Sequence, residues 1–183
     1  MGKKQNKSKW NALECALLIM LAVCLLMGAA ALGRQDRLQQ KMIRLHVVAN
    51  SDSQRDQALK LQVRDKVLAF TENTMRAAAD RQEANRTLRA ALPTIQAIAE
   101  ATLRENGCED RVETRLEPAE FPLKTYSGFR LPAGEYLALR VLIGKAEGQN
   151  WWCVVFPPLC TAAASDVPTV ALDAGLTDQE VAL

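Results

Sequence analysis

The sequence is poor in the residues on which many enzymes and nucleic-acid-binding proteins depend. Its 183 residues include one histidine, His46, and the formal net charge is +2. Histidine titrates near neutral pH without help from its surroundings, so its scarcity disfavours a histidine-based active site. Binding of nucleic acid needs clustered lysine and arginine, yet from Arg34 onward 19 basic residues are balanced by 20 acidic ones. Composition therefore argues against a nucleic-acid-binding protein.

Motifs for metal, phosphate and acid–base chemistry are also missing. No CxxC pair occurs, which together with a single imidazole disfavours a zinc site. Gly144 and Gly148 lack the Gly-Lys-Ser/Thr ending of a phosphate-binding loop. Glu135 stands alone, whereas glycoside hydrolysis needs two carboxylates. His46 falls on the polar face of a predicted strand, where we interpret it as a partly exposed sheet residue. The sequence thus predicts no catalytic residue, no metal site and no cofactor.

One long apolar run is present, at residues 15–32, directly after four lysines. Positive charge before an apolar run predicts that everything after Gly33 is exported across the membrane. A cut after Ala31 would make the run a signal peptide, and without the cut it is long enough to remain as a membrane anchor. A buried core helix is disfavoured because the run lacks a polar face. Residues 1–33 are therefore expected to be a signal peptide or an anchor, and residues 34–42 a spacer.

Export changes the meaning of the cysteines, because disulfides persist outside the cytoplasm. Two of the five cysteines lie in the apolar run, which leaves Cys108, Cys153 and Cys160. We favour a disulfide between Cys153 and Cys160, since the intervening prolines turn the chain; two reduced, buried thiols are the alternative. If Cys108 pairs with either of them, the favoured bridge is wrong.

Hydrophobic periodicity indicates the fold of the exported part. Periods of two alternate with helical spacing, and Pro93 is expected to break or kink the second helix. The expected strands are 43–50, 112–116, 136–143 and 151–156, and the expected helices are 54–78 and 82–106. This order predicts an α+β fold over residues 43–160, with a largely antiparallel sheet of about four strands and two helices packed on one face, preceded by the N-terminal hydrophobic helix. Residues 161–183 are expected to be a loose tail.

The first predicted helix begins in a cluster of polar side chains. Asn50 and Asp52 precede Ser53, and Ser53-x-x-Asp56 is a variant of the capping box. A cation or phosphate site is the alternative interpretation of this cluster, and helix capping is the one we favour.

The adjacent Trp151 and Trp152 are the least ordinary feature of the sequence. Neighbouring residues in a strand point to opposite faces, so both indoles cannot lie in one core. One is expected to cover the core, and the other to lie against the Pro157-Pro158 loop or on an open surface. An exposed tryptophan beside apolar residues suits a protein interface, whereas a small second cluster under a loop is the alternative.

Three segments resemble the stage II sporulation protein R family of endospore-forming Firmicutes. They are Ile43–Leu68, Phe121–Tyr126 and Leu131–Cys160. The resemblance implies a sporulation signalling protein that is exported from the forespore into the space between the two septal membranes. There it would activate a membrane-embedded aspartic protease, which cuts the pro-sequence from pro-sigma-E in the mother cell. The chain would then be a ligand of the protease, not an enzyme, and would touch the membrane only through an uncleaved N-terminal segment.

Docking on the outer part of the protease would favour the active state of the protease. Our candidate docking residues are Tyr126, Glu135, Tyr136, Trp151, Trp152, Phe156, Pro157, Pro158 and Leu159, with Asn50, Asp52 and Asp56 as secondary candidates. Two other hypotheses stay open: an exported cell-wall hydrolase using Glu135 with Asp52, and a passive structural protein of the intermembrane space.

Overall fold

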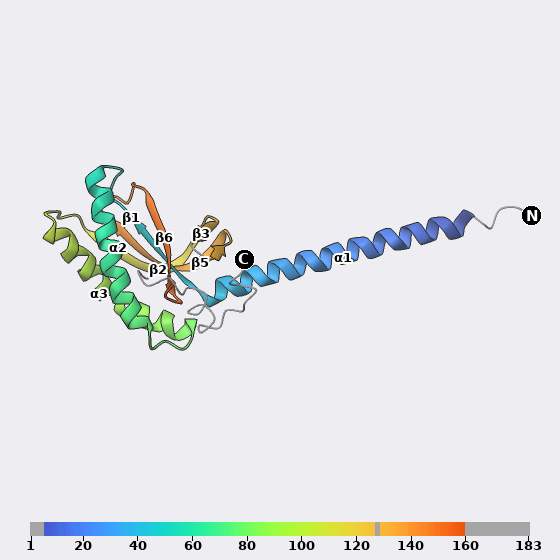
Figure 1. Ribbon diagram of the computed structural model, residues 1–183, viewed down its shortest axis with the longest axis horizontal. Helices are drawn as coiled ribbons and strands as arrows, with labels where there is room; N and C mark the ends of the chain where they lie inside the picture. The colour runs from blue at the N-terminus through green and yellow to red at the C-terminus, as the bar shows by residue number, and fades with distance from the viewer. Residues whose placement is uncertain (1–5, 127–128, 160–183) are drawn as a thin grey trace, which may run out of the picture. The chain divides into compact units, whose positions relative to one another are not determined.

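The structure is a computed structural model that describes residues 6–126 and 129–159 (Figure 1). Residue contacts divide the chain into two compact units, Met1–Arg37 and Leu38–Leu183. The elements are α1 (Asn6–Lys41), β1 (Ile43–Val48), α2 (Gln54–Met75), α3 (Arg81–Glu105), β2 (Val112–Phe121), β3 (Lys124–Tyr126), β4 (Phe129–Leu131), β5 (Gly134–Ile143) and β6 (Asn150–Phe156).

The first unit consists of the greater part of helix α1. Its stretch Ala12–Ala30 has a mean hydropathy of 2.4, and none of it is buried. By length and composition this stretch is able to cross a membrane, although a signal sequence has the same properties. The helix continues to Lys41, so the predicted spacer 34–42 is helical almost to its end. Whether the segment is cleaved stays a prediction.

The second unit contains a four-stranded sheet in the order β2-β5-β1-β6. Strand β5 is antiparallel to β2, and β6 is antiparallel to β1. The central pair β1 and β5 is parallel, with Leu45 opposite Leu139. A parallel pair needs a long connection, and here the chain passes through α2, α3, β2, β3 and β4 between β1 and β5. Helices α2 and α3 cover one face of the sheet (Figure 1), which confirms the predicted α+β class.

The main core lies between these helices and the sheet. The period of two in β1 is confirmed, because Ile43, Leu45 and Val47 are all fully buried on the helix side. Helix α3 contributes Leu88 and Ile95, which are also fully buried. At about 25 cal/mol per Å² of apolar surface, burial of these large side chains is the main source of stability for this layer.

Two local expectations are corrected by the structure. A break at Pro93 is wrong, because α3 continues through this exposed residue and buried Leu88 and Ile95 on either side hold both turns against the same sheet; the expected kink stays a prediction. The segment between β2 and β5 is not a plain connection, because β3 and β4 pair within it as a two-stranded antiparallel sheet. Each of these strands has only three residues, too few for a periodic pattern to be recognised.

Candidate functional site

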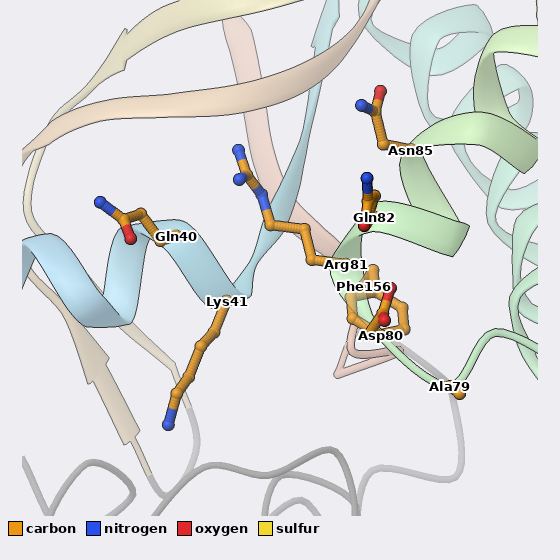
Figure 2. A pocket seen from close by; sticks show the side chains of 8 residues that line it. All are labelled: Gln40, Lys41, Ala79, Asp80, Arg81, Gln82, Asn85 and Phe156. Atoms are coloured by element: carbon orange, nitrogen blue, oxygen red, sulfur yellow. The ribbon is translucent and has the colours of Figure 1, made fainter.

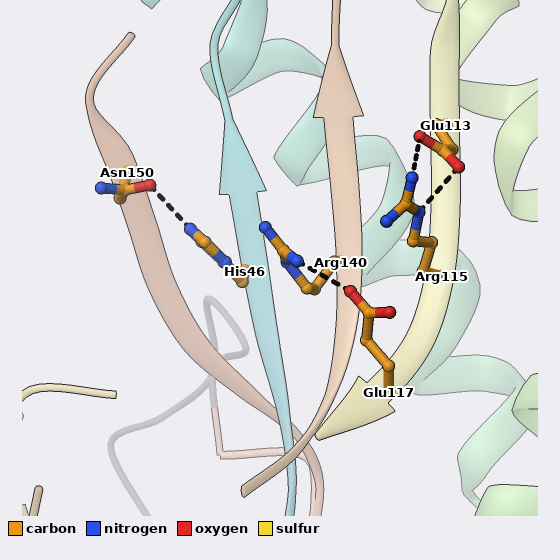
Figure 3. Close-up of polar contacts among 6 residues, drawn as sticks. All are labelled: His46, Glu113, Arg115, Glu117, Arg140 and Asn150. Atoms are coloured by element: carbon orange, nitrogen blue, oxygen red, sulfur yellow. Dashed lines mark hydrogen bonds and ion pairs between the residues drawn. The ribbon is translucent and has the colours of Figure 1, made fainter. Parts of the chain in front are cut away.

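The face of the sheet opposite the helices carries charged and aromatic side chains. The strand register places Arg115, Arg140, His46 and Trp152 in one row across β2, β5, β1 and β6. Figure 3 shows the polar contacts of this row: Arg140 Nη1 donates to Glu117 Oε1 at 2.7 Å, and Arg115 binds both carboxylate oxygens of Glu113. Most of the charge on this face is therefore neutralised locally.

Arg44 lies at the centre of this face and is fully buried. Its guanidinium carbon is 4.1 Å from the ring centroid of Phe121 and 5.0 Å from that of Tyr136. Its Nη2 donates to the Tyr126 hydroxyl at 2.7 Å, which ties strand β3 to the sheet. Burial lowers the pKa of Arg44, and the two tyrosines oppose that shift. Cation–π contacts with the rings offset part of the cost of burying this charge.

His46 is buried, with an exposed fraction of 7%, so its interpretation as a partly exposed residue is wrong. Its ring stacks on Trp152 with 3.9 Å between the ring centroids, and Nε2 lies 2.7 Å from Asn150 Oδ1. Desolvation lowers the pKa of His46, the hydrogen bond to Asn150 raises it, and the charge of Arg140 lowers it further. Strand alternation placed the residue on the correct face, but the neighbouring strand supplies the indole that covers it.

The two tryptophans lie on opposite faces of β6, which confirms the prediction from alternation. Trp151 packs against the main core, with the guanidinium carbon of Arg64 4.2 Å from its ring centroid. Trp152 packs against a second, smaller cluster that includes Phe121 and Tyr136. Of the alternatives for the second indole, the structure therefore shows the small second cluster.

A groove of about 480 Å³ lies along the start of β6, and we call it the β6-edge groove. Its lining residues are Gln57, Lys60 and Leu61 of α2, Lys124 and Tyr126 of β3, and Gln149, Asn150, Trp151 and Trp152 at β6. Three of the predicted docking residues, Tyr126, Trp151 and Trp152, therefore meet in one surface feature. Sequence reasoning did not single out the two lysines, because α2 and β3 are distant in the chain and only folding brings them to one groove.

The remaining docking candidates do not share this surface. Tyr136, Phe156 and Leu159 are buried, with exposed fractions of 1%, 4% and 4%, so their side chains present almost no area to a partner. The Tyr136 hydroxyl is already engaged, because it donates to the Pro132 carbonyl at 2.8 Å. Pro157 is buried and Pro158 half-buried, whereas Glu135 is exposed at the start of β5.

The secondary candidates Asn50, Asp52 and Asp56 hold two loops together. Asp56 accepts hydrogen bonds from Asn50 Nδ2 and Ser51 Oγ, which together lower the pKa of its carboxyl. Ser53 caps α2 by accepting from the Asp56 N–H at 3.1 Å, so the predicted helix cap is confirmed. Asp52 accepts from the Gln149 N–H at 2.8 Å, which links this loop to the one before β6. These contacts explain the cluster as structural.

The cysteines are placed as follows. Cys108 is a free thiol whose pKa is raised by burial, so in this structure it does not pair with Cys153. Cys153 is buried and disulfide-bonded. Cys160 lies outside the described residues, and the Cys153–Cys160 pairing therefore stays a prediction.

A second hollow of about 410 Å³ lies at the N-terminus of α3 (Figure 2). Its polar groups maintain the local fold. Asp80 accepts from the Glu83 N–H at 2.8 Å and caps the helix, and Arg81 Nε donates to the Met42 carbonyl at 3.1 Å. We assign no ligand to this hollow.

The structure separates the two carboxylates of the hydrolase hypothesis. Asp52 follows the end of β1, whose last residue Val48 pairs with Leu142, whereas Glu135 lies seven positions earlier on β5. At about 3.3 Å per strand residue, these positions are more than 20 Å apart. Glycosidase carboxyl pairs lie about 5–9.5 Å apart, so these two cannot act together. Within residues 6–126 and 129–159, no group of three His, Cys, Asp or Glu residues is arranged to hold a metal ion.

Comparison with known proteins places this domain in a family. The family model for stage II sporulation protein R matches residues 39–166. Stage II sporulation protein R of Bacillus subtilis (strain 168) is 40% identical over 123 residues, which cover 67% of this chain and 55% of that protein. The chain therefore matches about half the length of this curated relative, and no solved structure matches it. The chain belongs to the stage II sporulation protein R family.

Proposed function

We propose that this protein is an exported signalling protein that activates a membrane-embedded aspartic protease. In this proposal the protease then removes the pro-sequence of pro-sigma-E in the mother cell. The observation that supports the proposal most strongly is the family match, which extends over residues 39–166 and so includes every strand of the sheet and both helices that cover it.

The N-terminal helix is consistent with export from the forespore into the intermembrane space. Its apolar stretch Ala12–Ala30 follows lysines at positions 3, 4, 7 and 9, the order that directs the following domain outward. A domain placed there reaches the outer part of a protease in the facing membrane. The domain acts as a ligand, because it shifts the protease toward its active state by binding that state more tightly, about 1.4 kcal/mol for each tenfold preference.

Reconstitution outside sporulation tests this function. The full chain, the candidate aspartic protease and pro-sigma-E are co-expressed in vegetative cells, and the size of pro-sigma-E is followed by immunoblot. We expect the shorter, processed form only when all three proteins are present. The matched control lacks residues 1–33 and is expected to leave pro-sigma-E uncut. If export and folding of the full chain are verified and pro-sigma-E still stays uncut, the proposal is wrong.

A further inference from the structure

The β6-edge groove combines the start of an edge strand with a positively charged wall. Among the described residues, β6 pairs with β1 alone and forms one edge of the sheet. Edge strands present backbone N–H and C=O groups that an extended chain is able to pair with. The start of this strand lies between α2 and β3, which supply the two side walls of the groove.

The charge of the lining is of one sign. Among the described residues, the lining includes Lys60 and Lys124 and no aspartate or glutamate. Asp52 is the carboxylate whose charge acts on Lys60, but it does not line the groove, and it accepts a hydrogen bond from the Gln149 N–H at 2.8 Å. Arg64 adds a further positive charge near Lys60, although it also forms an ion pair with Asp65 at 2.7 Å. A partner with carboxylates thus complements this surface, and a basic partner does not.

The position of Lys60 is fixed by its neighbours. Its ammonium donates to Gln57 Oε1 at 2.6 Å and to the Gln149 carbonyl at 3.0 Å, and its exposed fraction is only 4%. These contacts use two of the three donors of the ammonium. A charge that is already held in place loses little side-chain entropy when it binds.

The groove also offers apolar area. Trp151 and Trp152 are half-buried, and Leu61 is 37% exposed. Aromatic side chains in such positions dominate the binding energy of many interfaces.

We propose that the β6-edge groove binds an extended, acidic peptide segment of a partner protein. Carboxylates of the segment pair with Lys60 and Lys124, and its apolar side chains lie on Leu61 and the two tryptophans. The inference rests on the proposed function in one respect, because the partner we expect to supply this segment is the outer part of the protease.

Peptide binding to the purified full chain in zwitterionic detergent micelles tests the groove itself. The probe is a fluorescently labelled eight-residue peptide of alternating glutamate and valine, and fluorescence anisotropy reports its binding. Two control peptides, its twins in length and pattern, carry glutamine or lysine in place of glutamate. We expect the acidic peptide to bind at least about tenfold more tightly than either twin, with an affinity that falls as salt rises. Equal binding of the acidic and glutamine peptides, or no binding at all, would overturn the proposal.

Variants locate the binding to the groove. Lys124→Gln and Leu61→Glu change groove side chains that are partly exposed, so both variants are expected to fold. Each should weaken the binding of the acidic peptide about fivefold or more. Lys66→Gln and Leu123→Glu are the matched controls. They make the same chemical changes at exposed residues that do not line the groove. Similar losses in the controls and the groove variants would contradict the assignment.

The same variants separate this inference from the proposed function. In the co-expression assay we expect Leu61→Glu to reduce processing of pro-sigma-E and Leu123→Glu to leave it unchanged. If pro-sigma-E is processed as well with Leu61→Glu as with the unaltered chain, the groove is not the protease contact. The inference then fails while the proposed function stands. If the unaltered chain gives no processing but binds the acidic peptide selectively, the proposed function fails and the groove is a peptide site for another partner.

Discussion

The two faces of the sheet are built from different chemistry. The face under α2 and α3 is packed with apolar side chains, whereas the opposite face buries a guanidinium, an imidazole and three aromatic rings. The helix-covered face derives its stability from area removed from water, which requires volume but no specific partner. The opposite face derives it from particular contacts, since each buried polar group there needs a donor, an acceptor or a ring. On the helix-covered face, the effect of a substitution on stability should therefore depend on the volume it removes. On the opposite face, it should depend on the hydrogen-bond or ring partner that is lost.

The largest effect is expected on the helix-covered face. Leu88→Ala removes a fully buried side chain of α3 and leaves a cavity, so we expect a loss of about 2–5 kcal/mol in the free energy of unfolding. Urea denaturation measures the loss. Leu88→Met nearly conserves the volume and is the control, with an expected loss below about 1.5 kcal/mol. Equal losses for the two variants would show that volume does not govern this face.

A smaller loss of stability is expected when one hydroxyl group is removed from the opposite face. Tyr126→Phe conserves the ring but removes the hydroxyl that accepts from Arg44 at 2.7 Å and donates to the Trp152 carbonyl at 3.3 Å. Because a buried guanidinium then loses a partner, we expect a loss of about 1–3 kcal/mol in the free energy of unfolding. Tyr136→Phe is the control: its hydroxyl bonds a neutral carbonyl, so its loss should be the smaller one. A larger loss for the control would refute the special role of Arg44.

The pH dependence of stability distinguishes the faces further. The pKa of His46 is lowered in the folded state, so the unfolded chain binds a proton that the folded chain does not. This contribution is complete above the ordinary value of 6.5 and is lost as the pH falls below it. We expect the free energy of unfolding to decrease by at most about 1.4 kcal/mol per pH unit in that range. His46→Gln, which removes the only histidine of the sequence, should flatten the profile between about pH 7 and pH 5.5. If the free energy of unfolding of His46→Gln still falls with pH as steeply as that of the unaltered chain, His46 is not the source of the pH dependence.

The smallest effect is expected where a single local contact is removed at an exposed helix end. Ser53→Ala removes the oxygen that accepts from the Asp56 N–H, at an expected cost of about 1 kcal/mol in the free energy of unfolding. Ser53→Asp provides an alternative capping oxygen and should restore most of the stability. If Ser53→Asp is no more stable than Ser53→Ala, the cap does not contribute in the way proposed.

Residue periodicity and capping chemistry are local, and for that reason much of the fold was predictable from the sequence. Alternation assigned Ile43, Leu45 and Val47 to the core, and Ser53 marked the start of α2. Trp151 and Trp152 were placed on opposite faces by the same geometric rule. Each of these predictions depends on residues only a few positions apart.

The candidate site needed the tertiary structure. The parallel pairing of β1 with β5 is made across a connection that contains α2, α3, β2, β3 and β4, and no local pattern specifies it. The groove combines Lys60 of α2, Lys124 of β3 and the tryptophans of β6, which are far apart in the chain. The sequence alone thus determined which faces of the strands are apolar and where the first helix is capped, because these depend on near neighbours. Only the packing of distant elements decided that Arg44 and His46 are buried and that two lysines lie beside Trp151 and Trp152, because desolvation and charge proximity depend on residues brought together by folding.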